Sequence, residues 1–205
     1  MKSVLISIQP KWCELIASGK KTVEVRKTNP KLETPFKCYI YCTKSGEGNL
    51  FKRSGNKFLG YHYEPMQGKV IGEFVCDVIY ETELIEESQT VIRHYPRPWW
   101  YNRADDCLHH TELENYLQGK TGYGWHISNL LIYDKPRELG EFYKPCIDEE
   151  YQYCPCCEYG HEIFSPDEVE YSADVRGACY EQICLNRVKR PPQSWCYVES
   201  EVEGE

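Results

Sequence analysis

Hydrophobic and polar positions divide the first part of the chain into short elements. Val4, Ile6 and Ile8 alternate with residues of the opposite face, which predicts a first strand. The apolar residues that follow Pro10 share one helical face, and Gly19 is expected to end this helix in a left-handed conformation. The same patterns predict further strands over residues 21–27, 36–43, 69–79 and 125–133.

The segments between these strands have other patterns. Residues 44–68 are rich in Gly, Ser, Asn and Lys without a period, which predicts a basic loop insertion. Residues 81–89 predict a short acidic helix. The spacing of Thr111 and Glu114 is that of a capping box and predicts a helix that ends near Gly119. The basic residues of the loop are Lys44, Lys52, Arg53 and Lys57.

Composition and charge narrow the class of protein. The 205 residues suffice for one domain with a small appendage, and the 41% hydrophobic fraction suffices for a core. No apolar run reaches the roughly 18 residues of a membrane span, and the first strand lacks the features of a signal peptide, so we expect a cytoplasmic protein. Residues 1–75 contain 13 Lys and Arg against 6 Asp and Glu, so one basic face can bind phosphate although the net charge is −8.

Three charged residues lie close together after the first helix. Glu24 and Arg26 share one face of the strand over 21–27, opposite Val23, and Lys21 joins them only from the preceding turn. Such a group can hold a phosphate or the edge of a base, with Glu24 as acceptor or general base. The alternative is an exposed strand with an ion pair between Glu24 and Arg26, worth roughly 0–1 kcal/mol.

The spacing Gly-x-Lys-x-x-Glu-x-Arg, met by Gly19, Lys21, Glu24 and Arg26, resembles the signature of the ASCH domain family, a member of the PUA-like superfamily. The resemblance implies an α+β fold, a PUA-like mixed β-barrel flanked by short helices. We assign residues 1–143 to this barrel with the insertion 44–68, residues 144–190 to a small cysteine-rich segment, and residues 191–205 to a terminal brace and acidic tail.

The resemblance also implies a function. It points to RNA, nucleotide or nucleoside binding in a cleft formed by Lys21, Glu24, Arg26, Trp125 and His126, although Trp125 also fits a core position. The alternatives are a hydrolase of a modified nucleoside or RNA and a protein-interaction scaffold; the oligomeric state is left open.

The catalytic alternative assigns the acid and base roles to Lys21 and Glu24. Family amidohydrolases acting on acetylated cytidine have a threonine where this chain has Glu24, and ribonuclease activity is also proposed for the family. Glu73 near the same lysine would favour catalysis over binding, because two carboxylates would then be available. Cys13 lies on the first helix without a histidine at a recognisable motif distance, so a nucleophilic role has weak support.

Cysteines gather near the end of the chain. Cys154, Cys157, Cys179 and Cys184 have spacing similar to a structural zinc site, and the segment holds few apolar residues for a core of its own. Free thiols or a disulfide are the alternatives. The rival ligands are Cys146, Cys156 and His161. Isolated cysteines elsewhere behave as small hydrophobes in a reducing compartment.

Overall fold

The first strand and helix follow the sequence pattern closely. In the computed structural model, β1 (Lys2–Ile8) precedes α1 (Pro10–Ala17), which has its proline in the first turn and Gly19 at a φ of +72° just after its end. The structure describes residues 2–48, 50–56, 60–84, 92–95, 107–108, 110–145 and 187–199, and everything below concerns these residues.

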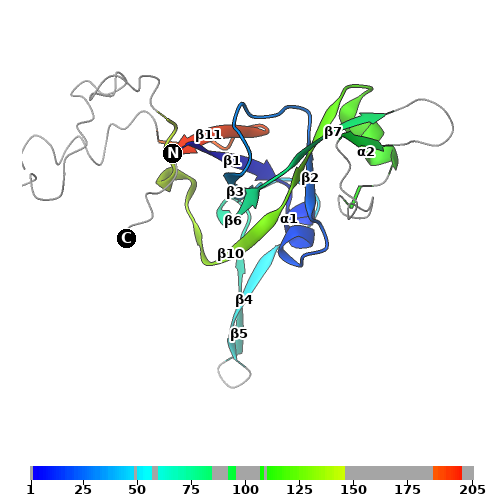
Figure 1. Ribbon diagram of the computed structural model, residues 1–205. Helices are drawn as coiled ribbons and strands as arrows, with labels where there is room; N and C mark the ends of the chain where they lie inside the picture. Colours follow the sequence, from blue (N-terminus) through cyan, green and yellow to red (C-terminus); the bar gives the residue numbers. More distant parts are fainter. Residues whose placement is uncertain are drawn as a thin grey trace, which may run out of the picture.

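Two sheets make up most of the described protein (Figure 1). The larger sheet has the order β10-β6-β3-β1-β11, in which β1 and β3 are parallel and the other neighbours antiparallel. Its other strands are β3 (Phe36–Cys42), β6 (Val70–Cys76), β10 (Ser128–Arg137) and β11 (Trp195–Glu199). The smaller sheet has the order β2-β9-β7-β8, formed by β2 (Val23–Arg26), β9 (Gly122–His126), β7 (Ile79–Leu84) and β8 (Ile92–Tyr95).

Apolar side chains bury both faces of β1. Val4, Ile6 and Ile8 pack with α1 and Trp125 in the main cluster, whereas Leu5 packs in a second cluster on the other face. The helix α2 (His110–Leu117) packs separately on β2, where its leucines contact Val25. The short 3-10 helix η2 (Leu139–Glu141) follows β10. This mixture of sheets and short helices confirms the predicted α+β class.

The predicted loop over residues 44–68 contains a β-hairpin, so the expectation of irregular structure throughout was wrong. The strands β4 (Phe51–Asn56) and β5 (Gly60–Pro65) pair antiparallel and extend away from the two sheets (Figure 1). A hairpin is held by backbone hydrogen bonds, so it needs no apolar period where it projects from the core. Met66 N–H donates to the Leu50 carbonyl at 3.0 Å at its base, and both side chains are buried.

Three other expectations change in detail. Residues 81–84 belong to strand β7 instead of an acidic helix, because pairing with β8 and β9 overrides the local helical preference. The long strands expected over 69–79 and 125–133 each divide between the two sheets, at residues 77–78 and at Ile127. The helix expected from Thr111 begins at His110 and ends before Gly119, so Thr111 lies inside its first turn.

Candidate functional site

The turn between α1 and β2 carries Lys21 back over the helix. Beyond the left-handed Gly19, the N–H groups of Lys20 and Lys21 both donate to the carbonyl of Leu15, at 2.9 and 3.0 Å. β2 begins two residues later at Val23. Lys21 therefore lies in the turn, as its strand parity required, and its side chain is buried instead of exposed.

Glu24 lies between two cations on the same side of β2. Its Oε1 is 3.0 Å from Arg26 Nη2, and its Oε2 is 3.5 Å from Lys21 Nζ. All three residues are buried, with relative exposures of 2% for Lys21, 6% for Glu24 and 7% for Arg26. We call these residues the buried triad. The alternative of an exposed strand is therefore not what the structure shows, because the ion pair between Glu24 and Arg26 is formed but buried.

Arg26 also reaches the first strand. Its Nη2 donates to the Ser7 carbonyl at 2.6 Å and so ties β2 to the end of β1. Two polar atoms of the triad nevertheless have no hydrogen-bond partner among the described residues, Glu24 Oε2 and Arg26 Nε, although Oε2 keeps its ion pair with Lys21. Buried polar atoms in native proteins are nearly always satisfied, so this pair needs an explanation.

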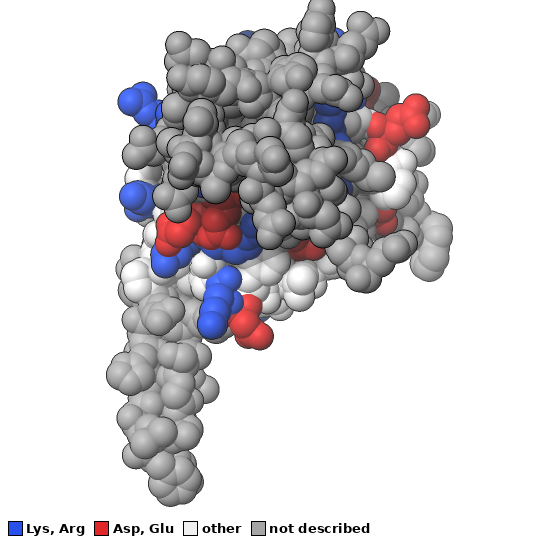
Figure 2. Space-filling view, turned by 90° about the vertical axis from the view of Figure 1, so that its left-hand side faces the viewer, with Lys and Arg blue, Asp and Glu red and all other residues white. Residues whose placement is uncertain are grey.

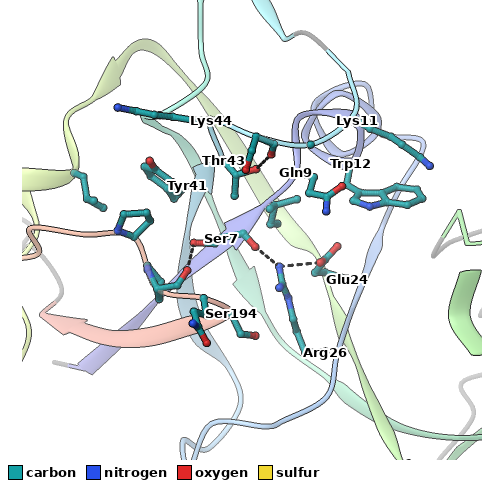
Figure 3. A pocket seen from close by; sticks show the side chains of 18 of the residues that line it. Ser7, Gln9, Lys11, Trp12, Glu24, Arg26, Tyr41, Thr43, Lys44 and Ser194 are labelled. Atoms are coloured by element: carbon teal, nitrogen blue, oxygen red, sulfur yellow. Dashed lines mark hydrogen bonds and ion pairs between the residues drawn. The ribbon is translucent and has the colours of Figure 1, made fainter. Parts of the chain in front are cut away.

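A cavity of about 1370 Å³ adjoins the triad. Figure 3 shows Glu24 and Arg26 on one side of it, with Trp12 and Gln9 from the start of α1 nearby and Tyr41 and Lys44 at the other end. Its charged lining residues comprise six cations and four carboxylates: Lys11, Lys21, Arg26, Lys44, Arg187, Lys189, Glu24, Glu47, Glu112 and Glu138. The triad end of the cavity is buried, whereas Lys44 and Lys189 are exposed, so the cavity has a buried charged end and a more exposed end.

Trp12 lies between two lysines at the buried end. The Nζ atoms of Lys11 and Lys21 are 4.4 and 5.2 Å from the centre of its ring, within the range of a cation–π contact. Lys11 also pairs with Glu112 at 2.9 Å and Glu47 at 3.4 Å, which raises the pKa of the lysine. Lys11 thus joins α1 to α2 and to the loop after β3.

Two further titratable groups border the triad. Burial raises the pKa of Tyr116, although the adjacent charge and hydrogen bond of Arg26 oppose this rise, so the hydroxyl remains a neutral donor at physiological pH. Burial also raises the pKa of Cys13 well above its ordinary value. Cys13 is fully buried and its Sγ faces the Ile8 carbonyl at 3.5 Å, which argues against a role as nucleophile in this cavity.

Two residues proposed for the cleft lie elsewhere. Trp125 is fully buried in the core and packs edge-on against Phe36. His126 Nδ1 is 2.6 Å from Asp77 Oδ1, and neither Trp125 nor His126 lines the cavity. Both residues belong to β9, which pairs with β2 so that Trp125 lies opposite Glu24 in the register. These two side chains therefore do not line this cavity, and their role in ligand binding stays a prediction from the sequence.

Glu73 does not join the triad either. It pairs with Lys37 at 3.1 Å and accepts a hydrogen bond from Tyr133, and all three residues belong to the larger sheet, whereas β2 belongs to the smaller one. The two-carboxylate arrangement that would have favoured catalysis is therefore not formed by Glu24 and Glu73. The proposed zinc ligands Cys154, Cys157, Cys179 and Cys184 lie outside the described residues, as do the rival ligands Cys146, Cys156 and His161.

Sequence reasoning missed one wall of the cavity. This wall is formed by the segment that returns after the cysteine-rich segment, together with Ser7 and Tyr116. Its only signal in the sequence was the run from Pro191 to Glu199, which has the character of a brace that returns to the barrel. Because its partner strand β1 is some 190 residues earlier, no local pattern places it there.

The face shown in Figure 2 carries lysine, arginine and acidic side chains next to one another. Among the described side chains on this face, basic and acidic groups are therefore mixed. Within the described part of the chain, no helix has the length and apolar character needed to cross a membrane.

Comparison with known proteins finds a similarity to one domain family. The model of the ASCH domain matches residues 6–102, which include the whole triad. The structure resembles ASCH from Zymomonas mobilis, at 16% identity over 97% of this chain and 89% of that one with a TM-score of 0.45. A serine-to-alanine mutant of that protein gives 16% identity over 96% of this chain and 88% of that one, with a TM-score of 0.49. A tyrosine-to-phenylalanine mutant gives 18% identity over 68% and 77%, with a TM-score of 0.45. No curated protein matches the sequence.

Proposed function

Because residues 6–102 match the ASCH domain, we propose that this chain binds RNA or a nucleotide in the cavity beside the buried triad. The observation that carries the proposal is the pair of unsatisfied atoms Glu24 Oε2 and Arg26 Nε. A buried donor or acceptor without a partner costs about 1–3 kcal/mol, and more when it is charged. A ligand that supplies both missing hydrogen bonds would remove this cost.

The edge of a base has the required chemistry. An exocyclic amino group or ring N–H can donate to Glu24 Oε2, and a carbonyl or ring nitrogen can accept from Arg26. A site built to hydrogen-bond such an edge discriminates strongly against ligands that lack it, because its own buried groups then stay unpaired. The indole of Trp12, held beside two lysines, adds an aromatic surface at the same end of the cavity.

Binding fits the geometry better than hydrolysis. Glu24 is engaged with cations on both sides, and Glu73 lies elsewhere, so the second carboxylate expected of an acid–base pair is not supplied by it. Cys13 is buried with a raised pKa. The hydrolase alternative, with Glu24 as base and Lys21 as acid, is retained as an outcome of the test.

The test uses conservative variants, because truncation of a buried ion pair also destabilises the fold. Glu24→Gln and Arg26→Lys are compared with the parent protein in titrations against nucleosides, nucleotides and short single-stranded RNAs. We expect the affinity of both variants to fall about 10- to 100-fold, which corresponds to about 1.5–3 kcal/mol for a hydrogen bond to a charged group. Glu33→Gln and Arg190→Lys are matched controls, exposed and outside the cavity lining, and should bind as the parent does.

The alternatives give different results. In a hydrolase, Glu24→Gln would retain affinity while turnover falls roughly 100-fold or more. If the parent protein binds none of these ligands, or if the two triad variants bind as tightly as their controls, the triad is not the ligand site.

A further inference from the structure

The more exposed end of the cavity has a wall formed by the returning chain. Seven residues of this segment line the cavity: Arg187, Val188, Lys189, Pro191, Pro192, Gln193 and Ser194. None of them falls within residues 6–102, which match the ASCH domain. We call this segment, residues 187–194, the return wall.

The return wall is fixed to the end of β1, which Arg26 of the triad also contacts. The backbone N–H of Ser7 donates to the Ser194 carbonyl at 2.9 Å, and its hydroxyl donates to the Pro192 carbonyl at 2.7 Å. The carbonyl of the same serine accepts from Arg26. Farther along, Val188 is buried and its N–H donates to the Phe142 carbonyl at 2.8 Å. The return wall is therefore a built part of the cavity, joined through Ser7 to the triad.

Two lysines from separate segments of the chain line this end of the cavity. Lys189 belongs to the return wall and Lys44 follows β3, and both are exposed. The stem of Lys44 lies against Gly68, where an added Cβ would approach its Cε to 2.6 Å. Figure 3 shows Lys44 beside Tyr41, at the opposite end of the view from Trp12. No ion pair to Lys44 or Lys189 is found among the described residues.

The carboxylates that line the cavity are already paired with other cations. Glu138 is 3.2 Å from Lys69, and Glu47 and Glu112 both pair with Lys11. Glu24 is held within the triad. The charge that remains uncompensated around the cavity is therefore positive at the end formed by the two lysines, and this favours an anion there.

We propose that Lys44 and Lys189 form a phosphate-binding end of this cavity, so that the site takes a phosphate-bearing ligand instead of a free nucleoside. The proposal rests on the proposed function, because it assumes that a base occupies the triad end. The cavity volume of about 1370 Å³ supports it, since ligand pockets for small molecules are typically about 300–1,000 Å³. Room thus remains beyond a base and its sugar for one or more phosphates.

The experiment compares each of the four ribonucleosides with its 5′-monophosphate by titration calorimetry. Lys44→Ala and Lys189→Ala are expected to weaken monophosphate binding about tenfold or more and to leave nucleoside binding within about twofold of the parent protein. Arg190→Ala and Lys20→Ala remove the same charge from exposed positions outside the cavity lining, and should change neither affinity by more than about twofold.

A single-stranded RNA of mixed sequence forms a second arm. If the phosphate belongs to an RNA strand, the two lysine variants should lose more affinity for RNA than for the monophosphate, and the salt dependence of RNA binding should flatten. Equal losses place the bound phosphate on a single nucleotide. Either result supports a phosphate-binding end.

Two outcomes overturn the proposal. The first is that Lys44→Ala and Lys189→Ala weaken nucleosides and monophosphates equally, or no more than the controls do; the proposed function then still stands if Glu24→Gln and Arg26→Lys lose affinity. The second is that the parent protein binds none of the probes, in which case the proposed function fails and the phosphate-binding end fails with it.

Discussion

Strands β1 and β2 are both buried, but their burial has opposite consequences. β1 buries Val4, Leu5 and Ile6 completely on its two faces, which stabilises the fold by removing apolar surface from water. β2 buries Glu24 and Arg26 almost as completely, and there the desolvation of the charges offsets much of their attraction. β1 therefore stabilises the fold by apolar burial, whereas a ligand better explains the buried charges of β2.

The largest expected effect comes from breaking the triad. Arg26→Ala should lower the free energy of unfolding by roughly 3–5 kcal/mol, because Glu24 is then left buried with one partner fewer. The triple variant Lys21→Met, Glu24→Leu, Arg26→Met should be as stable as the parent protein or more stable by about 1–4 kcal/mol, yet bind no ligand. Denaturant unfolding measures both changes.

A core variant sharpens this comparison. Ile6→Ala in β1 should lower the free energy of unfolding by roughly 2–5 kcal/mol, because it leaves a void in the main apolar cluster. No polar side chain at this position is expected to recover the lost stability. If the triple triad variant is destabilised as much as Arg26→Ala, the charges of β2 are structural and the contrast between the two strands disappears.

The second-largest effect is a loss of stability at alkaline pH, which is caused by a buried thiol in the apolar core. Burial raises the pKa of the Cys76 thiol from 9.0 to about 12. Between these values the unfolded chain loses a proton that the folded chain keeps, so stability is complete below about pH 9 and falls as the pH rises toward 12. The slope from this thiol reaches at most about 1.4 kcal/mol per pH unit.

Denaturant unfolding at a series of alkaline pH values measures that slope. Cys76→Ala should reduce it, whereas Val70→Ala should lower stability equally at every pH, because it removes a buried side chain without a titratable group. An unchanged slope in Cys76→Ala would contradict the prediction. Burial raises the pKa of Cys38 in the same direction, so some slope should remain in the variant.

A smaller effect is expected from the projecting hairpin. Replacing residues 52–64 by a short glycine linker keeps Leu50 and Met66, which close its base, and should change stability by no more than about 0.5 kcal/mol. The change removes Lys52, Arg53 and Lys57, so RNA affinity should fall and the slope of its logarithm against log salt should flatten by up to about 2. RNA binding with an unaltered salt slope would exclude the hairpin from the interface.

Changes in the cysteine-rich segment are expected to have the smallest effect on the stability of β1 and β2. Zinc binding by this segment remains a prediction from the sequence. The protein purified without chelators should carry about one zinc per chain, and Cys154→Ser or Cys184→Ser should release it while the sheets stay folded. Metal analysis measures the zinc content, and circular dichroism measures the fold. Substoichiometric zinc in the parent protein would remove the idea.

Local patterns in the sequence are sufficient to predict the first strands, the first helix and the members of the triad. The spacing from Pro10 to Gly19 predicted α1 and its left-handed end, and alternation predicted β1 and β3. The family signature singled out Lys21, Glu24 and Arg26. These features could be predicted because each depends on contacts within about one turn or on strand parity, which are properties of neighbouring residues.

Whether the triad side chains are buried or exposed depends on the tertiary structure. Parity placed Glu24 and Arg26 on one face but could not say that this face is buried, since that depends on Ser7 and on the cavity wall formed by residues 187–194. The tertiary structure also places Trp125 in the core, and it places Glu73 beside Lys37, away from the triad. Pairings such as β1 with β11 join residues some 190 positions apart, and no local pattern of polarity encodes such a contact.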